Sequence, residues 1–197
     1  MNELITIVFN LFMLPFEKIS LYKRRKELIS NANGNVLEIG SGGGINFNYY
    51  NPKYINSLKI LDLKFNKFIL NHKLNKKINI DYITANAENL PFEDKTFDTV
   101  VVTLTFCAIN NPTKALKEIY RVLKNDGKLI FIEHVLPHDK CCRKLAHSLN
   151  STWKKIGKCN INRDTYKYIE NADFKICNYE KFGNKIFLFI KGIAYKN

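Results

Sequence analysis

Apolar residues along this chain gather in short runs, and between the runs they recur every three or four positions. Short apolar runs rich in β-branched residues predict buried strands, whereas the three-to-four spacing predicts amphipathic helices. The segment Phe97–Leu104, FDTVVVTL, is the clearest strand, because it is continuous enough to be buried on both faces. The other strands predicted before residue 140 are 35–39, a run ending at Leu61 and Asp62, 78–85 and Lys128–His134.

Three helices are predicted around these strands. The first covers residues 17–30, with Gly34 as its expected stop, and its buried face consists of Leu21, Tyr22, Leu28 and Ile29. The second covers residues 64–72. The third begins at Asn111, has Pro112 in its first position and runs to Gly127. Strands that alternate with helices predict a parallel sheet with crossover helices.

The pattern changes after about residue 140. Two helices precede two further strands, 175–179 and 186–195, and a turn at Gly183 and Asn184 joins these strands as an antiparallel hairpin. The expected fold is therefore α/β, a Rossmann-like doubly wound sheet of seven strands, mostly parallel, with an antiparallel C-terminal hairpin. We divide the chain into an N-terminal apolar and basic helical segment, residues 1–30, and a cofactor-binding domain, residues 31–197.

The N-terminal apolar stretch has two interpretations. It is interrupted by Asn10 and closed by Pro15, so it is too short to span a bilayer, and it has neither the basic start nor the cleavage site of a signal peptide. One interpretation is a helix packed on the domain as a lid. The other is a contact with an anionic membrane surface, helped by the basic run Lys23–Lys26.

Composition narrows the class of protein. A chain of 197 residues fits one domain, which we expect to be monomeric. The net charge of +13 implies attraction to an anion, although a sequence rich in Lys, Asn and Ile is also what an AT-rich genome encodes. The five cysteines form no C-x-x-C pair and no zinc spacing, so we expect no metal site. We expect a cytoplasmic location, with membrane association if the N-terminal segment binds lipid.

The segment Val36–Gly44, VLEIGSGGG, carries the strongest chemical signal. A glycine-rich turn between a first strand and a helix binds cofactors that contain adenosine, such as NAD or S-adenosylmethionine (SAM). Glu38 is unfavourable beside a pyrophosphate but suits the ammonium group of SAM, and the glycine spacing is not G-x-G-x-x-G. Asp62 can accept hydrogen bonds from both ribose hydroxyls, a feature that the two cofactors share. A tight strand–helix turn is the alternative without a ligand.

Later segments add a family resemblance. With ANAENLPFEDKTFD at 85–98 and a helix ending in RVLKNDGKL, residues 16–174 resemble the class I SAM-dependent methyltransferases, in the branch that includes the quinone C-methyltransferases. The family has an acid at position 86, where Asn86 could still accept from the adenine amine. Glu88 follows the family pattern or caps its loop. The resemblance implies SAM as cofactor, S-adenosylhomocysteine as product, and these contacts besides Glu38 and Asp62: Gly40, Ser41, Gly42, Gly43, Gly44, Leu63, Asn86, Ala87, Glu88 and Thr103.

Shorter motifs narrow the resemblance to one group of proteins within this family. INFNYYNP, FCAINNP, EHV and the later set Trp153, Gly157, Cys159, Asn160 and Arg163 resemble small methyltransferase-like proteins typified by the microsomal thiol S-methyltransferases. Eukaryotic members of that group bind membranes through an apolar N-terminus, of which residues 4–16 are a shorter counterpart. The resemblance implies a small-molecule methyl acceptor, a thiol in the first place, with a phospholipid or a quinone as the alternative.

The acceptor chemistry follows from the reactivity of SAM. The methyl group on a sulfonium is already electrophilic, so in-line placement of the acceptor supplies much of the rate, and a thiol needs only modest help to ionise. The residues that could act on the methyl acceptor, near the carboxyl ends of the fourth and fifth strands, are Cys107, Glu133 and His134. We predict His134 as the catalytic residue that removes a proton. A structural histidine at a strand end is the alternative.

Two rival functions differ in class. A nucleic-acid methyltransferase of the N-P-P-Y type is not expected, because Asn110–Thr113 lacks the second proline and the aromatic residue. A non-catalytic SAM-binding protein is the second rival. The glycine loop and Asp62 argue against it, although binding motifs alone do not demonstrate turnover.

Overall fold

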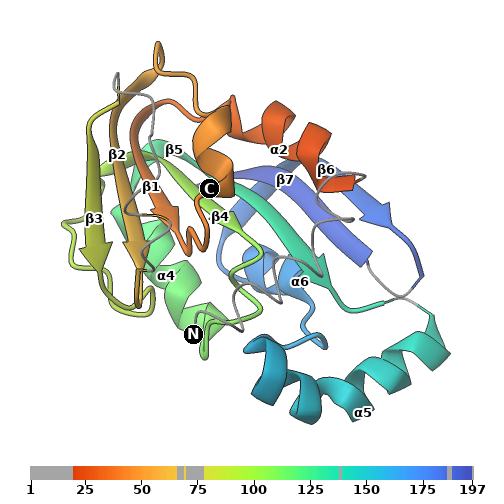
Figure 1. The fold of residues 1–197 in the computed structure, drawn as a ribbon. Helices are drawn as coiled ribbons and strands as arrows, with labels where there is room; N and C mark the ends of the chain where they lie inside the picture. The colour runs from red at the N-terminus through yellow and green to blue at the C-terminus, as the bar shows by residue number, and fades with distance from the viewer. Residues whose placement is uncertain (1–19, 66–68, 70–77, 138, 186–187, 197) are drawn as a thin grey trace.

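A computed structural model describes residues 20–65, 69, 78–137, 139–185 and 188–196 of the chain. Its seven-stranded sheet has the order β3-β2-β1-β4-β5-β7-β6 (Figure 1), and β7 is antiparallel to both of its neighbours while the other pairs are parallel. The strands are β1 (Gly34–Ile39), β2 (Ile55–Asp62), β3 (Ile80–Thr84), β4 (Phe97–Thr103), β5 (Leu123–Val135), β6 (Phe174–Gly183) and β7 (Leu188–Lys196). The predicted Rossmann-like sheet and its antiparallel C-terminal hairpin are confirmed.

Helices cover both faces of this sheet. On one face, α4 (Pro112–Val122) and α6 (Thr165–Glu170) pack on the odd-numbered side chains of β5, and on the other face α2 (Tyr22–Ile29) packs with the even-numbered ones. The long helix α5 (Lys140–Gly157) lies beyond the carboxyl end of β5 (Figure 1). A short 3-10 helix, η2 (Ile45–Tyr49), follows the glycine loop. None of the helices in the described part of the chain is long and apolar enough to cross a membrane.

The start of α4 is as predicted, but its end is not. The Asn111 side chain accepts from the Lys114 amide at 3.0 Å, and Pro112 occupies the first turn. The helix ends at Val122, well before Gly127, because its last carbonyls accept from the amides of Lys95 and Thr96. Strand β5 therefore starts directly at Leu123, which pairs with Phe97.

The start of the described chain also departs from expectation. Three of the predicted apolar residues are buried, namely Leu21, Leu28 and Ile29. Tyr22 is instead 49% exposed, and the centroid of its ring lies 5.8 Å from that of Tyr49. Helix α2 ends at Ile29, and Gly34 opens β1 instead of stopping the helix. The apolar stretch at 1–19 and most of the helix predicted at 64–72 lie outside the described residues.

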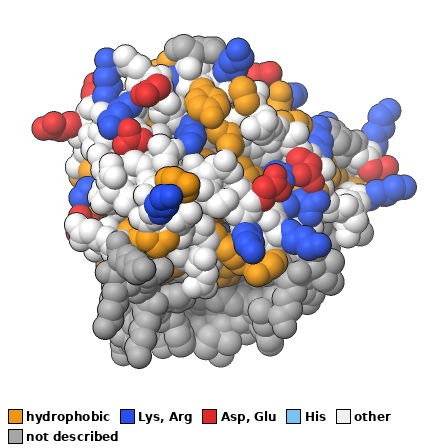
Figure 2. Space-filling view, turned by 90° about the horizontal axis from the view of Figure 1, so that it is seen from above, with side chains coloured by type: hydrophobic (Ala, Val, Ile, Leu, Met, Phe, Trp, Pro, Cys, Tyr) orange, Lys and Arg blue, Asp and Glu red, His pale blue; other side chains and the backbone are white. Residues whose placement is uncertain are grey.

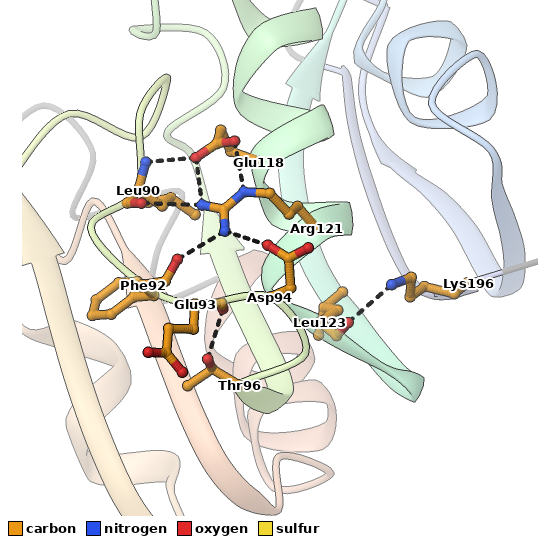
Figure 3. A network of polar contacts seen from close by, with 9 residues as sticks. All are labelled: Leu90, Phe92, Glu93, Asp94, Thr96, Glu118, Arg121, Leu123 and Lys196. Carbon is orange, nitrogen blue, oxygen red and sulfur yellow. Dashed lines mark hydrogen bonds and ion pairs between the residues drawn. The ribbon is translucent and has the colours of Figure 1, made fainter.

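Arg121 of α4 fixes the loop between β3 and β4, which includes the predicted site residues Asn86–Glu88. Its guanidinium donates to the carbonyls of Phe92 at 2.8 Å and Leu90 at 3.1 Å and pairs with Asp94 and Glu118 (Figure 3). Because Glu118 also accepts from the Leu90 amide at 2.8 Å, the backbone of this loop is held on both sides of Leu90. The motif in this loop therefore has a clear structural role.

Candidate functional site

The glycines of the loop after β1 differ in what surrounds them. Gly40, Gly42 and Gly44 all have positive φ angles, of 74°, 55° and 76°. A Cβ atom on Gly40 would lie 2.3 Å from the Thr105 side chain, and one on Gly44 would lie 2.8 Å from the Phe47 ring. A Cβ on Gly42 would meet nothing within 4 Å. Packing therefore requires two of these glycines, and the third borders open space.

Two polar residues, Ser41 and Asp62, lie next to Gly42 in sequence or in space. The Oγ atom of Ser41 is buried and has no hydrogen-bond partner among the described residues. Asp62 lies at the carboxyl end of β2, where burial raises the pKa of its carboxyl against the opposing hydrogen bonds from the backbone amides of Lys64, Gly42 and Leu63. The fold thus brings Asp62 beside Gly42, as the sequence predicted. Leu63 follows with 70% of its surface exposed, and Gly43 completes the turn.

Glu38 lies beneath the glycine loop, buried to 1% exposure. One carboxylate oxygen accepts from Asn46 at 3.0 Å and the other from the Tyr50 hydroxyl at 2.7 Å. Burial raises the pKa of Glu38 to about 7, against the opposing hydrogen bonds from Tyr50 and Asn46. The two donors belong to or follow η2, so the segment after the glycines orients this acid. The sequence motif of that segment, INFNYYNP, does not by itself indicate this role.

Most of the predicted site residues at the ends of β3 and β4 form hydrogen bonds with other residues of the protein. The Asn86 side-chain oxygen accepts from the Glu88 amide at 2.9 Å, and Glu88 in turn accepts from the Asn111 amide at 2.9 Å. Ala87 is buried in the core. The Thr103 hydroxyl accepts from Arg25 at 3.0 Å and from Asn46 at 2.9 Å. The structure therefore gives Glu88 a contact that fits the loop-cap alternative.

Glu133 organises the carboxyl ends of β4 and β5. Its Oε1 atom accepts from the amides of Thr105 at 2.8 Å and Phe106 at 3.1 Å, and its Oε2 atom is buried with no hydrogen-bond partner in the described chain. Burial raises the pKa of Glu133 to about 8. This side chain is therefore mostly protonated at neutral pH.

The motif from Trp153 to Arg163 closes over the loop that follows β4. Asn160 donates its backbone and side-chain N–H groups to the Cys107 carbonyl, at 2.8 and 2.9 Å, and Arg163 donates to the carbonyls of Phe106 and Ile109. The neighbouring Cys107 thiol lowers the pKa of Cys159, and Trp153 donates to the same sulfur at 3.2 Å. These long-range contacts show that the motif holds the backbone of the loop at residues 105–109 in place.

His134 lies on the opposite face of β5 from Glu133. Its ring meets the Phe189 ring edge-on at 6.1 Å, and burial lowers its pKa to about 4. The imidazole is therefore neutral at physiological pH and a weaker base than a free one. A role for His134 in proton removal stays a prediction. Within the described ranges, no group of three or more His, Cys, Asp or Glu side chains could hold a metal ion.

Comparison with known proteins gives this geometry a context. The model of the methyltransferase domain family matches residues 37–131. Thiol S-methyltransferase TMT1B of Rattus norvegicus is 35% identical over 164 residues, which cover 80% of this chain and 67% of the relative. A ubiquinone/menaquinone biosynthesis C-methyltransferase, UbiE of Haemophilus ducreyi, is 49% identical over 96 residues, 48% of this chain and 37% of the relative. A solved SAM-dependent methyltransferase from Methanosarcina mazei has the same fold, with a TM-score of 0.64, 20% identity, and coverage of 86% of this chain and 95% of that one.

The chain belongs to the class I SAM-dependent methyltransferases. The cofactor of this methyltransferase is SAM, as the glycine loop predicted. The described residues fit that cofactor, since the loop leaves open space at Gly42 and the Gly42 amide donates to the Asp62 carboxyl, while the neighbouring residue Ser41 has a buried hydroxyl without a partner among the described residues. The predicted small-molecule methyl acceptor is also confirmed at the level of the family.

Proposed function

We propose that this methyltransferase transfers the methyl group of SAM to a lipophilic thiol. The observation that carries the proposal is the similarity to a thiol S-methyltransferase over 80% of this chain, which extends well beyond the match to the general methyltransferase domain. When bound, SAM supplies a methyl group that is already electrophilic, so the protein has to orient the acceptor and exclude water.

The titratable groups at the end of β5 agree with a thiol acceptor. Glu133, with a pKa of about 8, and His134, with a pKa of about 4, are both mainly uncharged at neutral pH. His134 is therefore a weak base, and Glu133 already carries its proton in most molecules. A thiol has an ordinary pKa of about 8.5 and needs little help to ionise, unlike an alcohol or a quinol carbon. A thiolate and a sulfonium also lose their charges together in the transition state, which an apolar site favours.

The cofactor contacts in this proposal come from three loops. The glycine loop, Gly40–Gly44, lets the backbone approach the cofactor, Glu38 binds its ammonium group and Asp62 binds the ribose hydroxyls. Asn86 accepts from the adenine amine. The other proposed contacts are Ser41, Leu63, Ala87, Glu88 and Thr103.

Quinone C-methylation is the second candidate function. It is favoured by the 49% identity to UbiE, although that similarity covers less than half of this chain. Phospholipid methylation is a third candidate, from the family resemblance alone. A panel of thiols, quinols and lipid amines, assayed with labelled SAM, separates the three. Thiol methylation as the dominant activity supports the proposal, and transfer to quinols with none to thiols contradicts it.

His134→Ala should lower turnover mainly on weakly acidic thiols. A base helps only an acceptor that arrives protonated, so the loss in kcat/KM should vanish for the most acidic thiol. For the least acidic thiol it should be about 10-fold, below the usual range of base catalysis because a group of such low pKa is a weak base. The measurement is a rate series over thiols of graded acidity, with SAM affinity as the control. An equal loss for every thiol would indicate positioning instead, and no loss would remove His134 from the mechanism.

The finer proposal for partners adds an anionic membrane surface to the acceptor and keeps the protein monomeric. Within the basic run, Arg25 is buried and Arg24 pairs with Glu180 at 2.7 Å, which leaves Lys23 and Lys26 exposed. On the face drawn in Figure 2, Lys and Arg side chains are scattered among acidic and apolar ones instead of forming one patch. Lipid binding would therefore depend chiefly on the apolar stretch that precedes α2.

Removal of residues 1–15 should abolish co-sedimentation with acidic liposomes at low salt. The apolar stretch supplies the burial in lipid, and the remaining exposed lysines add only weak, salt-sensitive attraction. A Lys23→Glu, Lys26→Glu variant is the matched control, and we expect it to weaken sedimentation without abolishing it. Equal sedimentation of the full and shortened chains would favour the lid.

A further inference from the structure

A chain of buried polar side chains connects the N-terminal helix to the cofactor loop. Arg25 of α2, only 4% exposed, donates to the Asn46 side-chain oxygen at 2.7 Å and to the Thr103 hydroxyl at 3.0 Å. Asn46 links Arg25 to Glu38, because its amide nitrogen donates to Glu38 at 3.0 Å. Tyr50 donates to the other oxygen of Glu38 at 2.7 Å. The chain therefore runs from α2 through η2 to the end of β1.

The direction of these hydrogen bonds is fixed by chemistry. A guanidinium only donates and a carboxylate only accepts, so the Asn46 amide between them must turn its oxygen to Arg25 and its nitrogen to Glu38. Both oxygens of Glu38 then face donors. The arrangement is complete when Glu38 is ionised, which is also the form that can bind an ammonium group.

At neutral pH Glu38 lies close to the balance between its ionised and its protonated form. The titratable and charged groups that interact with it are Arg25 from α2, Tyr50 after η2, Asp62 from β2 and Tyr82 from β3, whose own pKa is raised by burial and by Glu38. Burial raises the pKa of Glu38 to about 7, Tyr50, Asn46 and Arg25 oppose this, and Asp62 adds to it. Tyr50 stays a protonated donor, because burial and the neighbouring Glu38 raise its own pKa. Loss of one positive charge here should therefore change the charge state of Glu38 near neutral pH.

We propose that Arg25 is a positioning residue of the cofactor site, which holds the Glu38 carboxylate ionised and oriented for the SAM ammonium group. The inference rests on the contact proposed above between Glu38 and that group. It makes α2 a working part of the cofactor site, because the docked helix delivers the charge on which tight binding depends. Binding of SAM and docking of α2 then stabilise each other.

The test is the pH profile of cofactor affinity. Calorimetry with S-adenosylhomocysteine, which has the same ammonium group and is not turned over, is run over about pH 5.5 to 9.5. Wild-type affinity should rise through neutral pH as Glu38 ionises, and fall at high pH as the amino group of the ligand loses its proton. In Arg25→Met the acid limb should move up by about one pH unit or more, with about a 10-fold loss of affinity at neutral pH and an unchanged alkaline limb.

Matched variants separate charge from structure. Arg24→Met removes the neighbouring guanidinium, which pairs with Glu180 at the opposite end of the chain, and should keep the wild-type profile. Arg25→Lys keeps the charge and should restore most of the acid limb. If Arg25→Met does not fold, Arg25→Gln removes the charge from a side chain that can still hydrogen-bond. A loss of affinity by the same factor at every pH, or no change at all, would overturn the proposal.

One further variant tests the contact on which the inference rests. Glu38→Gln should bind S-adenosylhomocysteine weakly and without an acid limb. Wild-type affinity in Glu38→Gln would refute the ammonium contact and the inference together. Weak binding by Glu38→Gln with an unshifted acid limb in Arg25→Met would refute the role of Arg25 alone.

Discussion

Gly42→Val should lose SAM binding by a factor of at least about 100, while the protein remains folded. A Cβ atom on this residue would meet nothing within 4 Å, so the new side chain would extend into the volume proposed for the cofactor. The φ angle of 55° would add strain of about 1–2 kcal/mol for a residue other than glycine. Calorimetry with SAM and thermal unfolding measure the two effects separately.

Two other glycine variants are the controls for this prediction. Gly42→Ala carries a similar backbone strain with a much smaller side chain, and should bind SAM better than the valine variant. Gly40→Val should unfold far more readily, because its Cβ would lie 2.3 Å from the Thr105 side chain. Normal SAM affinity in Gly42→Val would mean that this glycine serves only the turn.

Asp62→Ala should weaken SAM binding by about 2–3 kcal/mol, a range typical of hydrogen bonding to a charged acceptor. The carboxyl lies beside the amides of Gly42 and Leu63, at the place where a ribose would meet both the glycine loop and the end of β2. Asp81→Ala is the matched control, since Asp81 lies on the neighbouring strand β3 and pairs with Lys59 at 2.7 Å on the surface.

A cofactor analogue sharpens the assignment of Asp62. S-adenosylhomocysteine without the two ribose hydroxyls should bind equally to wild type and to Asp62→Ala, because the contact is already lost on the ligand side. Unchanged affinity for intact SAM in a folded Asp62→Ala variant would contradict the ribose assignment.

The sheet was predictable from the sequence because its signals are local. A run such as Phe97–Leu104 is buried on both faces wherever its neighbours lie, and the glycines after Ile39 mark the turn without further information. The end of α4 was not predictable, since the amides of Lys95 and Thr96, which donate to its last carbonyls, come from a different loop. Tyr22 was misplaced for a similar reason, because its partner Tyr49 belongs to η2.

The site was predictable only where a single segment forms it. In the sequence Arg25 is one member of a basic run, and nothing local distinguishes it from Arg24. Its burial depends on Asn46 of η2 and Thr103 of β4, which the fold brings to α2. Glu133 and His134 show a second limit: neighbours on a strand face opposite sides of the sheet, and the sequence does not say which side meets the loop after β4.

The position of β7 has a consequence for how the chain folds. Among the described strands β7 comes last in sequence, yet it lies between β5 and β6, and Lys128 pairs with Tyr195 while Phe174 pairs with Lys196. Strand β6 can therefore join the sheet only once β7 has paired with β5. Such non-local pairing forms slowly, because a long loop must close before any contact is gained. Until then β5 presents an open strand edge, so refolding yield should fall as protein concentration rises.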